Sequence, residues 1–233
     1  MVFSPFRFCL PLALLMLIAT DPLWAQQDDE QFWFQLNTNV PLAKDVRVTL
    51  EQITRLSDRQ DGIYMTEFGA LLGYRISKQV ELGFGYRRVD SHNGNDAPGE
   101  NRFRQQILGN FGHFSTRLRV DERFSDAGPG IGFRIRPLLR YNLPLGKPRT
   151  ALYVIHESFY LPNSTSWGQR SGYDRMRNAI GVTLPVGRYT SVDLGYLNQY
   201  RPARTGRQAQ MDHALNLQIT VNLTAQPTAP TQD

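Results

Sequence analysis

The sequence predicts an all-β protein, an antiparallel transmembrane β-barrel of about 10 to 12 strands. Three observations predict it. Segments of about ten residues with alternating polar and apolar side chains follow one another from Gln31 onward. Clusters of Gly, Pro, Asn, Asp and Ser separate these segments, and the connections alternate between short and long. No segment has the periodicity of a long helix.

Residues 1–25 are expected to be a secretory signal peptide. Arg7 precedes an apolar run from Phe8 to Ala19, and the segment ends on Leu-Trp-Ala at Ala25. The alternative is a membrane-anchoring helix, which needs about 20 apolar residues and finds fewer here. The single cysteine, Cys9, lies inside this segment, so the exported chain has none. Residues 26–223 then form one barrel domain, and the polar, Pro-rich residues 224–233 are expected to be disordered.

The chain is basic, with 26 Lys and Arg residues against 21 Asp and Glu residues and a net charge of +5. A basic balance can indicate nucleic-acid binding. Export and the spacing of the charges strand by strand argue against that partner, so we expect none.

Eleven strands are expected, and this odd number departs from the even count of bacterial single-chain barrels. Either one strand is miscounted or the first segment pairs unusually. The expected ranges are 32–40, 46–55, 63–76, 79–89, 101–111, 114–124, 132–143, 151–160, 173–184, 190–200 and 211–223.

One side of nearly every expected strand is charged, as the stretch STRLRVDERF (115–124) illustrates. A soluble sandwich or soluble barrel would show the same two faces, with the apolar face inward. Placed inside a membrane barrel, the charged faces form a ladder of paired side chains. Its members are Arg102, Arg104, Arg117, Arg119, Arg123, Arg134, Arg136, Arg140, Arg175 and Arg177 with Glu51, Glu67, Glu81, Asp121, Glu157 and Asp193.

Strand length favours the membrane barrel, because about ten residues cross a bilayer when tilted. Aromatic residues near the strand ends fit an interfacial girdle. Those expected there are Tyr64, Tyr74, Tyr86, Tyr141, Tyr160, Tyr196 and Tyr200. The three lysines, Lys44, Lys78 and Lys147, all fall in short connections, which we assign to the periplasmic side.

Arginine suits a narrow lumen because its planar guanidinium binds carboxylates with two hydrogen bonds. The ladder is interpreted as structural, holding the barrel closed. A second interpretation is a narrow passage or binding site that favours anions, because the ladder contains more cations than acids.

Several motifs together resemble the family of outer-membrane barrel-like proteins called domain of unknown function 2490 (DUF2490). They are FWFQLNTNV, ELGFGYRR, ENRFRQQ, RLRVDERF, FRIRPLLRYNLPL, HESFYLPN, RMRNAIGVTL and VDLGYLNQY, within residues 31–223. The resemblance implies an outer-membrane barrel and no known activity, and it carries no catalytic residues over to this chain.

One group could carry chemistry. His156 and Ser158 share the lipid-facing side of their strand, and Asn178 lies at about the same depth on the next one. This arrangement is similar to outer-membrane phospholipase A, with Ser158 as nucleophile, His156 as base and Asn178 as orienting residue. An interfacial His and Ser without catalytic role is the simpler interpretation, so the chain is expected not to be an enzyme.

No other chemical motif stands out. The four histidines have no metal-type spacing, and neither a GxSxG elbow nor a phosphate-binding glycine loop occurs. We therefore expect no metal and no cofactor. The expected partners are the lipid bilayer of a Gram-negative outer membrane and the barrel-assembly machinery; the sequence specifies no small ligand.

Overall fold

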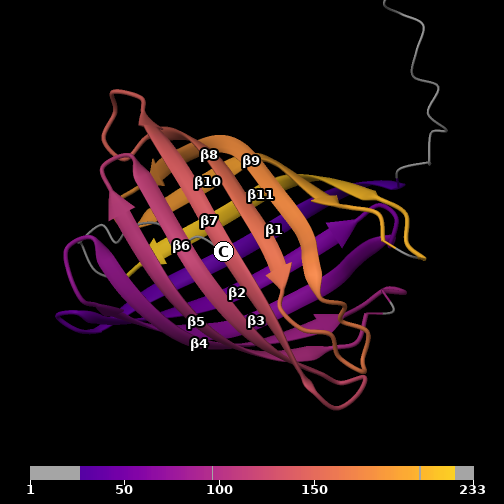
Figure 1. Cartoon of the computed structure of the whole chain (residues 1–233). Helices are drawn as coiled ribbons and strands as arrows, with labels where there is room; N and C mark the ends of the chain where they lie inside the picture. Colours follow the sequence, from indigo (N-terminus) through magenta and orange to yellow (C-terminus); the bar gives the residue numbers. More distant parts are fainter. Residues whose placement is uncertain (1–26, 96, 205, 224–233) are drawn as a thin grey trace, which may run out of the picture.

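The computed structural model describes residues 27–95, 97–204 and 206–223 and shows a closed barrel of eleven strands (Figure 1). The predicted signal peptide, 1–25, and tail, 224–233, lie outside the described residues. The strands are β1 (Gln27–Ala43), β2 (Val46–Ser57), β3 (Gly62–Arg75), β4 (Val80–Ser91), β5 (Glu100–Phe111), β6 (Phe114–Ser125), β7 (Ile131–Pro144), β8 (Ala151–Leu161), β9 (Gly172–Val186), β10 (Thr190–Arg201) and β11 (Gln210–Asn222). The all-β barrel predicted from the alternation is confirmed.

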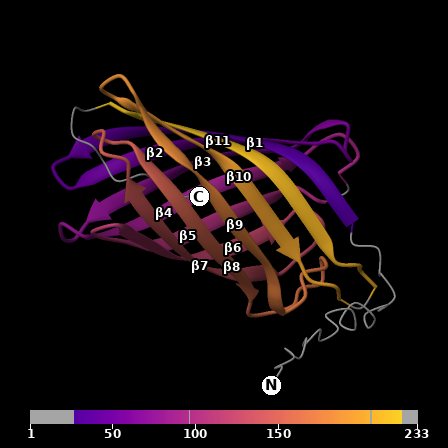
Figure 2. The same cartoon turned by 90° about the horizontal axis from the view of Figure 1, so that it is seen from above.

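The barrel is closed by a parallel pair. Consecutive strands pair antiparallel throughout, but β1 pairs with β11 in parallel, from Gln27 opposite Gln210 to Asn39 opposite Asn222. The two strands lie side by side in both views (Figure 1, Figure 2). The prediction of an antiparallel barrel is therefore wrong at this one seam. The reason is the odd strand number, because the first and last strands of an up-and-down chain then run in the same direction.

The parallel closure places the two ends of the described chain at opposite ends of the barrel. β1 begins at Gln27, beside the long connection between β10 and β11. β11 ends at Asn222, beside the short connection between β1 and β2. We call the two ends of the barrel the long-connection end and the short-connection end. Lys44, Lys78 and Lys147 all lie at the short-connection end.

The charged side of each strand faces the lumen and the apolar side faces outward. Arg104, Arg117 and Arg119 are at most 1% exposed. Large apolar side chains of the other parity, such as Phe68, Phe84 and Ile180, are more than half exposed. The barrel is thus the reverse of a soluble one, which buries its apolar side.

Tyr64 departs from the predicted outward position. Arg55 of β2 pairs with Met65, and the next residue, Leu56, pairs with Ile63, so Tyr64 is the extra residue of a bulge. Its side chain is buried, and its hydroxyl donates a hydrogen bond to Oε1 of Gln31 at 3.0 Å. Its assignment to the aromatic girdle is wrong, because a bulge shifts the alternation by one residue.

A pair of glycines makes room for a buried ring. Gly195 of β10 lies opposite Gly181 of β9. A Cβ at Gly195 would lie 2.5 Å from the carbonyl oxygen of Ile180 and 2.5 Å from the Tyr153 hydroxyl. The ring of Tyr153 therefore covers these two strands only because both positions lack side chains.

Replacing Gly195 with alanine is expected to lower the free energy of unfolding by about 1 to 3 kcal/mol, because the new methyl group meets backbone atoms that cannot move aside. Urea unfolding of the refolded barrel in detergent, followed by tryptophan fluorescence, measures the change. Gly73→Ala is the matched control, since the nearest atom there is a carboxylate oxygen at the far end of the Glu81 side chain. Equal stability of Gly195→Ala and wild type would contradict this account of the packing.

Candidate functional site

Glu157 of β8 is the acceptor for three lumen arginines. Its Oε1 lies 2.5 Å from Nη2 of Arg117 and 2.9 Å from Nη2 of Arg136, and its Oε2 lies 3.7 Å from Nη1 of Arg177. The Glu157 side chain is 2% exposed. Asp121 of β6 likewise pairs with more than one arginine, since its Oδ2 lies 2.6 Å from Nη2 of Arg134 and 3.6 Å from Nη1 of Arg136.

A second group of ion pairs joins β2 and β3 to β4 and β5, four successive strands of the wall. Arg87 bridges Glu51 and Glu67, with both contacts at 2.9 Å. Arg102 pairs with Glu67 at 3.3 Å, and Arg104 pairs with Glu51. Since β3 and β4 lie between β2 and β5, the Arg104–Glu51 contact connects strands that share no backbone hydrogen bonds.

The structure places the rest of the predicted ladder in the lumen as well, in smaller groups. Arg140 pairs with Asp193, Arg47 pairs with Glu81, Arg123 pairs with Glu100, Arg175 pairs with Asp174, and Arg119 donates to Gln106. The acids Glu100 and Asp174 and the base Arg47 were not part of the predicted ladder, although the same alternation points them inward.

Polar side chains fill the lumen at the short-connection end. Asn39 accepts hydrogen bonds from Nη1 of Arg47 at 3.1 Å and from the Thr49 hydroxyl at 2.6 Å. Its amide donates to Oδ1 of Asn222 at 2.8 Å. Nη2 of Arg47 also lies 2.7 Å from Glu81, so this network joins β1, β2, β4 and β11.

A cavity of about 710 Å³ occupies the remainder of the lumen. Residues of the long connections line its outer end, among them the exposed Arg170 and Arg207. Within the described part of the chain, no residue of a short connection lines it. The cavity therefore meets solvent at the long-connection end.

Positive charge dominates the cavity wall. Fourteen arginines and six carboxylates line it. Burial lowers the pKa of Arg207, in the connection after β10; Asp174 opposes this shift, and Arg175 and Arg204 add to it. The lowered pKa of Arg207 therefore reflects burial first and the neighbouring cations second.

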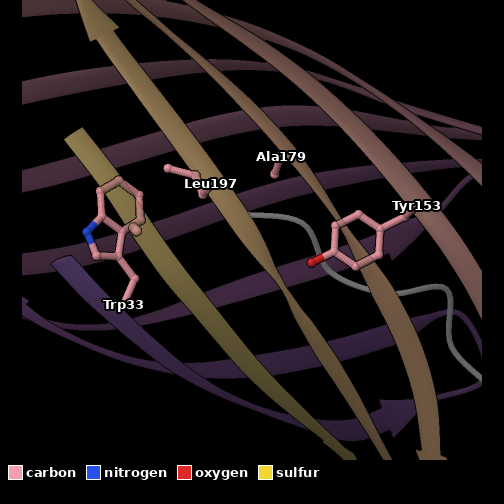
Figure 3. Packing of buried hydrophobic residues seen from close by; sticks show 5 residues of the cluster. Trp33, Tyr153, Ala179 and Leu197 are labelled. Carbon is pink, nitrogen blue, oxygen red and sulfur yellow. The ribbon is translucent and has the colours of Figure 1, made fainter. Parts of the chain in front are cut away.

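An apolar patch lies inside the lumen, on a wall formed by β8, β9, β10, β11 and β1 (Figure 3). Its residues are Trp33, Tyr153, Ala179, Leu197 and Ala214, with Ile155 packed against them. These residues were not predicted from the sequence, because single apolar residues at inward positions are scattered over five strands. The available signal was that they interrupt the polar parity.

Two aromatic rings of the lumen carry guanidinium groups on their faces. Arg55 and Arg177 lie 4.1 Å and 4.7 Å from the ring centre of Trp33. Phe159 has Arg136 and Arg177 at 4.7 Å. Such cation–π contacts hold the arginines in fixed positions around the cavity.

On the outer wall, Ser158, His156 and Asn178 form one hydrogen-bonded chain. His156 and Asn178 are cross-strand partners on β8 and β9. Nδ1 of His156 lies 2.8 Å from Oδ1 of Asn178, and Nε2 lies 3.0 Å from Oγ of Ser158. In the tautomer with its proton on Nδ1, His156 donates to Asn178 and accepts the serine proton, which is the geometry of an activated serine nucleophile.

Within residues 27–95, 97–204 and 206–223 there is no helix that could cross a membrane. The same residues contain no cluster of three His, Cys, Asp or Glu side chains suited to a metal ion.

Comparisons with known proteins give a family but no activity. The family model described as "Protein of unknown function (DUF2490)" matches residues 30–210. An uncharacterized protein of Methylorubrum extorquens is 34% identical over 222 residues, covering 90% of this chain and 96% of that protein. One solved chain, from a structure titled "Unveiling the Mechanism Behind the in-meso Crystallization of Membrane Proteins", has a TM-score of 0.42 and 14% identity, and the match covers 78% of this chain and 79% of that one.

Replacing Glu157 with glutamine is expected to lower the free energy of unfolding by about 3 to 5 kcal/mol, because three buried arginines lose their shared negative charge. Equilibrium urea unfolding measures this loss. Glu122→Gln is the matched control, since Glu122 faces outward and accepts one hydrogen bond from Gln105. A loss no larger than that of the control would show that the ion pairs of Glu157 do not stabilise the barrel.

Proposed function

This chain belongs to the DUF2490 family of proteins of unknown function, and we propose that it is a non-enzymatic β-barrel of the outer membrane of a Gram-negative bacterium. The observation that carries the proposal is the reversal of the two strand faces. Phe68, Phe84, Ile180 and Leu215 face outward and are between 53% and 57% exposed, while arginines are buried inside. Water would not stabilise such an outer surface, whereas acyl chains would.

Aromatic side chains at both ends of the apolar band support the same proposal. Tyr160 and Tyr173 are exposed near the long-connection end. Phe114 and Tyr141 are exposed near the short-connection end, with ring centres 4.9 Å apart. Rings of this kind lie at the boundary between acyl chains and headgroups.

The three lysines of the short connections support an orientation with those connections in the periplasm. In that orientation β11 ends on the periplasmic side and β1 begins on the outer side. The signal peptide predicted at 1–25 would direct export, and the barrel-assembly machinery and the lipid bilayer are the partners this location requires.

The filled lumen favours a structural role over that of an open pore. In an eight-stranded barrel, side chains just fill the interior. An eleven-stranded barrel is wider than that and much narrower than a porin. Here the network of Asn39, Arg47, Thr49, Glu81 and Asn222 occupies the short-connection end. No continuous aqueous passage is expected through it.

The unboiled protein from the membrane fraction is expected to migrate differently in SDS gels from the boiled protein, because a closed barrel resists SDS until it is heated. After reconstitution into planar bilayers it is expected to show no steady ion conductance. A protein found in the periplasmic fraction with equal mobility before and after boiling would exclude the outer-membrane proposal. Steady conductance from a heat-modifiable protein would exclude only the closed lumen.

A second candidate function is hydrolysis of an acyl ester of a membrane lipid, which the chain of hydrogen bonds through Ser158, His156 and Asn178 favours specifically. Ser158 would attack the ester carbonyl while His156 accepts its proton. His156 would then return that proton to the leaving alkoxide, and water would release the acyl group by the reverse sequence. The outward position of these residues would present the serine to acyl chains.

In this candidate function, the refolded protein is expected to release fatty acid from phospholipid or lipopolysaccharide vesicles, and Ser158→Ala is expected to lower the rate by at least about 10³-fold. Mass spectrometry of the released acids measures it. Thr66→Ala is the matched control, because the Thr66 hydroxyl lies 2.8 Å from Nε2 of His92 on another part of the same wall, exposed as well. Absence of release, or release that survives Ser158→Ala, would eliminate this function.

A further inference from the structure

The lumen cavity combines two kinds of wall. All residues of the apolar patch except Ala214 line it, namely Trp33, Tyr153, Ile155, Ala179 and Leu197, and Figure 3 shows how four of these lie relative to one another. Arginines surround this patch and continue to the mouth. A volume of about 710 Å³ falls within the range of small-molecule sites, about 300 to 1,000 Å³.

The charges of the wall are not balanced. Fourteen arginines and six carboxylates line the cavity. Three more buried carboxylates, Glu51, Asp121 and Asp212, pair with lining arginines without lining the cavity themselves, which still leaves the cations five in excess. Arg177 shows how thinly the acids are shared, since its contact with Glu157 is 3.7 Å long and Arg136 and Arg117 occupy the same carboxylate at shorter distances. A bound anion would reduce the repulsion among these fixed cations. Its attraction to them would be stronger than in bulk water, because the protein around the cavity has a lower dielectric constant.

The arginines next to the patch are already positioned. Arg177 lies against both Trp33 and Phe159, and Arg175 follows two residues closer to the mouth, 5.8 Å from the Phe159 ring centre. Arg201 and Arg207 line the same route outward. A ligand entering from the long-connection end would therefore meet guanidinium groups before and beside the apolar patch.

We propose that this cavity binds an organic anion with a flat apolar body, whose ring system lies against Ile155, Ala179 and Leu197 beside the Trp33 ring and whose carboxylate, sulfonate or phosphate group is held by Arg177 and Arg175. The class of ligand follows from the two kinds of side chain in the wall. A bare inorganic anion would contact only the arginines, and a neutral aromatic compound would contact only the apolar patch. The inference rests on the closed lumen of the proposed function and does not depend on the membrane location.

Isothermal titration calorimetry of the refolded full-length barrel in lipid nanodiscs, with empty nanodiscs as the blank, tests the proposal. The probe is naphthalene-1-sulfonate. It is expected to bind saturably at one site per barrel, with an affinity that falls as salt is added. Inorganic sulfate and 1-naphthylmethylammonium, which each carry one half of the recognised chemistry, are expected to bind at least about tenfold more weakly.

Two variants locate the site. Arg177→Gln removes one cation beside the patch, and Ala179→Leu fills the apolar wall without changing any charge. Each is expected to weaken binding of the sulfonate by about tenfold or more. Arg188→Gln is the matched control, because Arg188 is exposed in a short connection and does not line the cavity.

Heat-modifiable gel mobility of each variant establishes that its barrel has closed, so that a folding defect is not read as a binding defect. Arg177 also takes part in the Glu157 network, so the Arg177→Gln barrel can fail to close. In that case the binding measured for Ala179→Leu tests the proposed site. Absence of saturable sulfonate binding would overturn the proposal. Equal binding of the cationic probe, or full affinity in Ala179→Leu, would overturn it as well. If the barrel does not insert into nanodiscs but binds the sulfonate saturably when refolded in detergent, this inference stands and only the proposed location is removed.

Discussion

Buried guanidinium charge is the constraint on which the rest of this structure depends. An isolated charge buried among the side chains of the lumen costs several kcal/mol, so a buried inward arginine needs an acceptor within reach. The long arginine side chain can reach past a neighbouring strand, and Arg104 of β5 pairs with Glu51 of β2 in this way. Such contacts connect strands that share no backbone hydrogen bonds, and they determine where the lumen is filled and where the cavity remains.

Alternation alone was sufficient to predict the barrel and to divide most of its charged and large apolar residues between lumen and outer wall. It could not predict partners, because which arginine meets which acid depends on how far neighbouring strands are displaced along one another. Glu157 illustrates this, since its three arginines come from β6, β7 and β9. Tyr64 marks a second limit, because a bulge reverses the direction of a side chain and has no clear signal in the sequence.

The outer wall shows what local geometry adds to a short motif. From the sequence, His156 and Asn178 could be placed only at a common depth. The structure shows that they are cross-strand partners and that two hydrogen bonds join them to each other and to Ser158. The same geometry sets a condition for catalysis there. Backbone N–H groups of a closed barrel are used in pairing the strands, so an oxyanion at Ser158 would have to be stabilised by side chains.

The parallel seam follows from the odd strand number and has consequences of its own. Parallel pairing is slightly less stable per residue than antiparallel pairing, and β1 must meet a strand that lies at the far end of the sequence. The seam compensates by its length, with thirteen consecutive paired positions and no shift of register. The side chains of Asn39 and Asn222 add a hydrogen bond across it at 2.8 Å. Because Asn39 also accepts from Arg47 and Thr49, one side chain joins the seam to the network that fills the short-connection end of the lumen. The buried charges inside and the pairing of the first and last strands therefore depend on each other.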